Sequence, residues 1–114
     1  MIVEVQHMEE LLKQIGTRIR TRRKQLRLSQ EQLAEMAGIT PQTVSTAELG
    51  QKAMRPETTI RICEALEIST DYLLLGKITA DDQSVLCHKL SQLSPNQYRY
   101  LEDIINSYIA AVTE

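Results

Sequence analysis

The chain has 114 residues, a formal net charge of −2 and 42% hydrophobic residues, which suffices for one domain or for a small domain with an appendage. It lacks Trp and Phe, so its core must use Leu, Ile, Val, Met and Ala, a mixture that favours helices over strands. No apolar run approaches the roughly 18 residues of a membrane span, and the first five residues are too short and too acidic for a signal peptide, so we expect a cytoplasmic protein without membrane attachment. Cys63 and Cys87 lack the spacing of a zinc site, so we expect no metal.

A long helix is predicted first, over about 8–27, because apolar residues recur at helical spacing from Met8 to Leu26. This helix opens a basic region between Lys13 and Pro56, in which nine basic residues outweigh three acidic ones. The remaining acidic residues lie before and after that region. A basic face on an otherwise acidic chain is typical of a protein that contacts nucleic-acid phosphates, whereas a basic run on its own is more often a solvated helix face.

Two short helices joined by a tight turn are predicted over about 29–49. Ser29 and Gln32 form the Ser-x-x-Gln pattern of a capping box, and Gly38 ends the helix that they begin. Thr40 caps the next helix, which has Pro41 in its first position. The residues that we expect to face the core are Leu33, Met36, Ala37, Val44 and Ala47. The pattern is a helix-turn-helix, whose second helix lies in the major groove of DNA.

Four further helices complete an all-α chain. Start and stop signals predict helices over about 56–66, 70–75 and 80–92, and a last helix that starts at Pro95. Glu67 stands where glycine usually ends the helix over 56–66, so we expect a looser junction there. Residues 77–80 are the expected seam between an N-terminal head and the two C-terminal helices.

Several short motifs between Ile15 and Gly76 occur at characteristic spacing. They are Arg-Ile-Arg, Leu-Ser-Gln-Glu-Gln-Leu-Ala, the Ala-Gly-Ile-Thr turn, Glu48 with Gly50, and Arg-Pro-Glu-Thr. Together they resemble the Cro/CI-type (Xre) family of bacterial and phage helix-turn-helix regulators. The resemblance implies a lambda-repressor-like five-helix head over 15–76, preceded by the N-terminal segment 1–14. It also implies a partner, double-stranded operator DNA, and usually a homodimer.

The second helix of the helix-turn-helix carries the candidate base-contacting residues. They are the outward-facing Gln42, Thr43, Ser45 and Thr46. Gln42 can form two hydrogen bonds with adenine, and Thr46 can bond a base or touch a thymine methyl group, although ordinary helix surface is the alternative for both. The candidate phosphate-contacting or bracing residues are Gln30, Arg20, Arg27, Lys52 and Arg55. The resemblance implies that Gln30 contacts the DNA backbone and braces the first recognition residue.

Glu48 is the one acidic residue of this second helix, where an unpaired carboxylate would repel DNA. The family pattern pairs this glutamate with an arginine at the position of Arg23, which implies a structural ion pair. The sequence departs from the family at Ala47, Leu49 and Thr46, which replace larger apolar, polar and basic residues. These departures leave few strong base donors, so specificity would be modest or would rely on DNA shape.

Residues 77–114 are predicted to form a C-terminal two-helix hairpin. Its second helix carries an apolar stripe that is wider than packing on a small head needs. The stripe consists of Tyr98, Leu101, Ile104, Ile105, Tyr108, Ile109 and Val112. We interpret the stripe as a dimerisation element, because a two-fold axis matches a palindromic operator. Folding of the hairpin back onto the head is the alternative.

An enzyme is not expected, because the sequence has no glycine-rich phosphate loop, no nucleophile with a base at recognisable spacing and no cluster of histidines or cysteines. No cofactor is expected either. Two functions remain open. One is a dimeric, sequence-specific repressor that reads a palindromic operator. The other is an antitoxin-like or protein-interaction module on the same fold with weak DNA binding. The basic region favours the first, and the few base donors leave room for the second.

Overall fold

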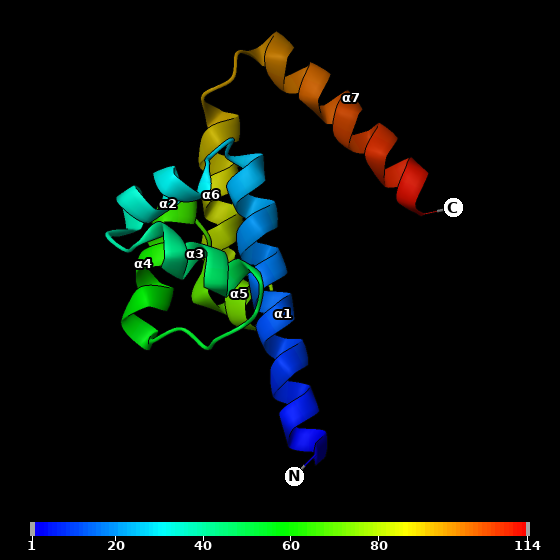
Figure 1. The fold of residues 1–114 in the computed structure, drawn as a ribbon. Coiled ribbons are helices and arrows are strands. Elements are labelled where there is room, and N and C mark those ends of the chain that lie inside the picture. Colours follow the sequence, from blue (N-terminus) through cyan, green and yellow to red (C-terminus); the bar gives the residue numbers. More distant parts are fainter. Residues whose placement is uncertain (1, 114) are drawn as a thin grey trace. The chain divides into compact units, whose positions relative to one another are not determined.

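The computed structural model describes residues 2–113, and the side chains of residues 4–113, as seven helices without a strand (Figure 1). Five helices come first: α1 (Ile2–Gln25), α2 (Gln30–Ala37), α3 (Pro41–Glu48), α4 (Pro56–Leu66) and α5 (Thr70–Leu75). Two more follow: α6 (Ala80–Ser91) and α7 (Pro95–Val112). The all-α prediction is confirmed. The bounds of α1 were predicted least well, since this helix begins at Ile2 instead of near residue 8 and ends at Gln25 instead of residue 27.

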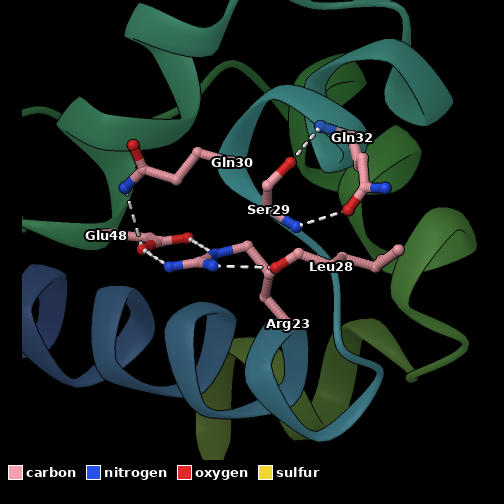
Figure 2. Close-up of polar contacts among 6 residues, drawn as sticks. All are labelled: Arg23, Leu28, Ser29, Gln30, Gln32 and Glu48. Carbon is pink, nitrogen blue, oxygen red and sulfur yellow. Dashed lines mark hydrogen bonds and ion pairs between the residues drawn. The ribbon is translucent and has the colours of Figure 1, made fainter.

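The predicted capping signals set the start of α2 and α3. Ser29 Oγ accepts a hydrogen bond from Gln32 N at 3.0 Å, and Gln32 Oε1 accepts one from Ser29 N at 2.8 Å, so the capping box is confirmed (Figure 2). Thr40 Oγ1 accepts from Thr43 N at 3.1 Å at the start of α3. These bonds satisfy backbone donors that lack a partner within the helix. The turn between the two helices is therefore fixed at both ends by local chemistry.

The hydrophobic core lies among α1 to α5, and Figure 1 shows α2 to α5 packed beside the long helix α1. Its large, fully buried side chains are Ile19, Leu33, Val44, Ile62, Leu66 and Leu73. The prediction that Met36 faces the core was wrong, because this side chain is 57% exposed and Ala34 is buried in its place. The buried residues of α2 are Leu33, Ala34 and Ala37, so its core side consists of one leucine and two alanines.

Within residues 2–113, two residues other than glycine adopt the left-handed conformation where helices end. Arg27 follows α1 with φ 59°, and Glu67 follows α4 with φ 55°. The N–H groups of Glu67 and Ile68 still bond to the last carbonyls of α4, and Arg22 Nε donates to Leu66 O at 2.9 Å. The junction that we expected to be loose thus has the hydrogen bonds of an ordinary helix cap, with backbone strain at Glu67 as its cost.

The chain divides into two compact units between Thr79 and Ala80. The first unit contains α1 to α5 and the whole core. In the second unit, no side chain of α6 or α7 is buried by its own unit. Within residues 2–113, none of the helices combines the length and hydropathy that crossing a membrane requires.

Candidate nucleic-acid interface

Helix α3 presents a polar row on the side opposite its buried residues. Val44 and Ala47 are buried, whereas Gln42 is exposed and Thr46 half-exposed. Gln42 Nε2 donates to Thr46 Oγ1 at 3.4 Å, which links the two side chains along the outer face. Thr43 differs from both, because its hydroxyl lies 2.8 Å from that of Thr40 at the start of the helix.

An open hollow of about 430 Å³ lies between α3 and the loop that leads to α4. Gln42, Thr43 and Thr46 line one side of it, and Lys52 and Arg55 line the other. Three of the predicted base-contacting residues and two of the predicted phosphate-contacting residues thus meet at one surface. The half-buried Ser45 does not line this hollow, and neither do Gln30, Arg20 or Arg27.

Behind α3, Arg23 and Glu48 form the ion pair implied by the family resemblance (Figure 2). Arg23 Nε donates to Glu48 Oε2 at 2.6 Å, and Arg23 Nη2 donates to Oε1 at 2.9 Å. The guanidinium also donates through Nη1 to the Leu28 carbonyl at 2.9 Å. The pair therefore ties the end of α3 to the end of α1 and to the segment that begins α2.

Gln30 completes this network from the first residue of α2. Its Nε2 donates to Glu48 Oε1 at 3.1 Å, as Figure 2 shows. The family resemblance implied a brace to the recognition residue, but the amide braces the carboxylate instead. All three hydrogen bonds that Glu48 accepts come from within the protein, so its negative charge is compensated there. The hydrogen bond to Glu48 raises the pKa of Arg23 above its usual value, while burial acts in the opposite direction, so Arg23 stays charged.

The basic residues of α1 fall into two groups. Arg18 Nη1 donates to Leu73 O at 2.9 Å, and Arg22 Nε donates to Leu66 O at 2.9 Å. These carbonyls lie at the C-terminal ends of α5 and α4, where a positive charge is favourable. In contrast, Arg20 is exposed, as are Lys24 and Arg27 at the end of the helix. Sequence reasoning did not separate a structural group from a solvent-facing one within this basic run.

A second feature that the sequence reasoning missed is the contact between the backbones of α1 and α3. Gly16 is buried in α1, and a Cβ atom placed on it would lie 2.4 Å from the Glu48 carbonyl oxygen. On the other side, a Cβ on Gly50 would lie 2.9 Å from the Lys13 Cα atom. Both glycines therefore allow the end of α3 to rest directly on α1. A glycine inside an apolar helical pattern, as at Gly16, is the signal that could have revealed this contact.

Comparisons with known proteins agree with this geometry. A family model described as Helix-turn-helix matches residues 19–73. Repressor protein C2 of Salmonella phage P22 is 35% identical over 65 residues, which are 57% of this chain and 30% of that protein. The uncharacterised HTH-type transcriptional regulator YqaE of Bacillus subtilis (strain 168) is 31% identical over 97 residues, which are 81% of this chain and 84% of that protein. The present chain thus spans less than a third of the P22 repressor but most of YqaE.

The fold comparison points the same way. The crystal structure of the P22 c2 repressor in complex with a synthetic operator matches with a TM-score of 0.54 and 36% identity, over 55% of this chain and 96% of that chain. The match to YqaE covers most of both proteins, and the family model covers α2 to α4 completely. The protein therefore belongs to the Cro/CI-type (Xre) family of helix-turn-helix transcriptional regulators.

Proposed function

We propose that this regulator is a cytoplasmic repressor that binds a palindromic operator as a homodimer and reads the major groove with α3. The observation that carries the proposal is the hollow where Gln42 and Thr46 face Lys52 and Arg55. Amide and hydroxyl groups suit base edges, and the two cations suit phosphates on the flanking strand. The related P22 c2 repressor has been crystallised with a synthetic operator, which supports DNA as the partner.

Phosphate contacts would come from the exposed cations of the head. Lys52 and Arg55 lie in the loop beside α3, and Arg20 and Arg27 are exposed on and just after α1. Thr43 and Ser45 are base-contacting candidates at the flanks of the α3 face. Gln30 keeps one amide donor besides its bond to Glu48, and this donor is available for a phosphate.

The dimer would form through α7. Seven apolar residues of this helix form the proposed dimerisation stripe, namely Tyr98, Leu101, Ile104, Ile105, Tyr108, Ile109 and Val112. Leu101 is half-buried and the other six are exposed, with Tyr108 at 68%. Most of the stability of a helix in a protein comes from packing of its apolar face, so α7 would gain from a partner along its stripe. Each large apolar side chain that becomes buried contributes roughly 1.5–3 kcal/mol, so four or more would support a stable dimer.

Selection of bound duplexes from a random DNA pool tests the operator proposal. A palindromic motif with half-sites about 34 Å apart is expected for two copies of α3. In the selected site, Gln42→Ala should cost about 1–3 kcal/mol and leave binding to random DNA unchanged, whereas Lys52→Ala should weaken both equally. Failure to select any motif would favour a protein-interaction or antitoxin-like module. Equal losses for Gln42→Ala on both DNAs would refute base reading by that residue.

Sedimentation of the full chain tests the dimer. Ile105→Asp places a charge in the apolar stripe and should give a folded monomer with weaker operator binding. Ser107→Asp adds the same charge on the opposite side of α7 and should remain a dimer, so it is the matched control. A monomeric wild-type chain at micromolar concentration would refute the assembly, and so would a chain ending at Thr79 that dimerises equally well.

A further inference from the structure

The exposed face of α3 lacks the side chains that most often read guanine. Helix α3 contains neither lysine nor arginine, and its one charged residue, Glu48, is held by Arg23. Arginine or lysine bonding to guanine O6 and N7 is the commonest specific contact in the major groove. The readout of this helix must therefore use uncharged groups.

Those uncharged groups form a single row along the helix. Gln42, Thr46 and Leu49 are spaced four and three residues apart, so they project from the same side of α3. Leu49, the C-cap residue that directly follows α3, keeps a helical backbone conformation, ends the row and is 58% exposed. Leu49 therefore presents apolar surface to solvent beside the candidate DNA-contacting residues.

The first two members of the row are hydrogen-bonded to each other. Gln42 Nε2 donates one hydrogen to Thr46 Oγ1 at 3.4 Å. The amide keeps its second N–H and its oxygen, which match adenine N7 and the adenine N6 amino group. In this arrangement, the hydrogen bond to the Thr46 hydroxyl orients the Gln42 amide.

The rest of the row is apolar. It consists of the Thr46 methyl group and the Leu49 isobutyl group, and the one apolar group that a base pair presents in the major groove is the thymine 5-methyl. We infer that the recognition helix selects A·T base pairs, with Gln42 bonding adenine and with Thr46 and Leu49 packing on thymine methyl groups. This inference rests on the proposed function and specifies the class of operator that α3 accepts.

Replacing thymine by deoxyuridine in the selected operator removes only the methyl group, so it tests the inference directly. Each thymine of the half-site is replaced in turn, and affinity is measured for the wild type and for Leu49→Ala, Thr46→Ser and Thr46→Val. Thr46→Ser keeps the hydroxyl without the methyl group, and Thr46→Val does the reverse. Met36→Ala is the matched control, because Met36 has a similar exposure of 57% but lies on α2 outside the row.

Loss of one methyl contact should weaken wild-type binding about fourfold per half-site. Deoxyuridine in place of the thymine that Leu49 contacts should weaken binding of the wild type but should not weaken binding of Leu49→Ala. In the same way, deoxyuridine in place of the thymine that Thr46 contacts should not weaken binding of Thr46→Ser. Thr46→Val should keep its sensitivity to deoxyuridine but lose preference for adenine opposite Gln42. Met36→Ala should behave as the wild type throughout.

Two results would overturn the inference while leaving the proposed function intact. One is a selected palindrome whose half-site has G·C pairs at the positions sensitive to Gln42 and Leu49. The other is a deoxyuridine penalty that is equal in the wild type and in both methyl-removing variants. Failure to select any palindrome would instead refute the proposed function, and the inference with it.

Discussion

Breaking the ion pair between Arg23 and Glu48 from either side should destabilise the head, and removing both partners together should not. The Glu48 side chain is 3% exposed and that of Arg23 is 11% exposed. In Arg23→Ala, the carboxylate stays buried with only the Gln30 amide as a partner. In Glu48→Ala, the guanidinium keeps its bond to the Leu28 carbonyl and lies nearer to water.

The magnitudes follow from this asymmetry. Removing one partner of a buried ion pair costs about 3–5 kcal/mol. Arg23→Ala should lie near the upper end of that range because the more deeply buried charge is the one left behind, and Glu48→Ala should lie near the lower end. The double variant Arg23→Met/Glu48→Leu strands no charge and should cost less than about 1 kcal/mol, because apolar replacement of a buried pair is often neutral.

Equilibrium unfolding in urea, followed by circular dichroism, measures these changes in the free energy of unfolding. Glu57→Ala is the control, because it breaks the 2.7 Å pair with Arg61 whose two side chains are 74% and 48% exposed. An exposed pair of this kind contributes less than about 0.5 kcal/mol. The reasoning fails if either single variant at the buried pair costs no more than Glu57→Ala. It also fails if the double variant loses the sum of the two single losses.

Three further outcomes are expected. Gly16→Ala should lower the free energy of unfolding by roughly 1–3 kcal/mol, because its Cβ would meet the Glu48 carbonyl oxygen of α3; an unchanged melting temperature would contradict the backbone contact. Glu67→Gly should raise the urea midpoint by the equivalent of about 1 kcal/mol, because φ is 55° there, and a lower midpoint would show that the glutamate side chain contributes more than its strain costs. Operator affinity should fall by a factor of roughly 10³–10⁵ between about 50 and 200 mM salt, and Lys52→Ala should reduce the slope of log affinity against log salt concentration by about one. An affinity that does not change with salt would argue against phosphate contacts.

Local signals explain why most helix bounds could be predicted. The Ser-x-x-Gln pairs at Ser29 and Ser94 form capping boxes in the structure, and each operates within four residues of chain. No such signal marks the start of α1. The prediction therefore began near Met8, where apolar periodicity becomes recognisable, although the helix continues back to Ile2. Helix ends without a capping residue depend on whether the next turn is stable, which periodicity does not reveal.

Packing partners were harder to predict than helix positions. Met36 has the correct helical spacing for a core residue, yet Ala34 occupies the inward position. The spacing of apolar residues on an eight-residue helix fits two orientations, and the distance to the neighbouring helices decides between them. The bond from Gln30 to Glu48 was missed for the same reason, since the two residues are 18 positions apart in the chain.

For the basic region, the number of charges could be predicted from the sequence, but the roles of the individual arginines could not. Sequence alone counts nine cations between Lys13 and Pro56 as potential phosphate contacts. The structure commits Arg18 and Arg22 to carbonyls and Arg23 to Glu48, because these arginines lie within one turn of the buried Ile19 and face the core side of α1. The other six cations are exposed, and the commitment of Arg23 also removes Glu48 as a source of repulsion. The charge available to DNA therefore depends on which side of α1 each arginine occupies. The helical spacing of the arginines indicates that side, whereas a simple count of charges does not.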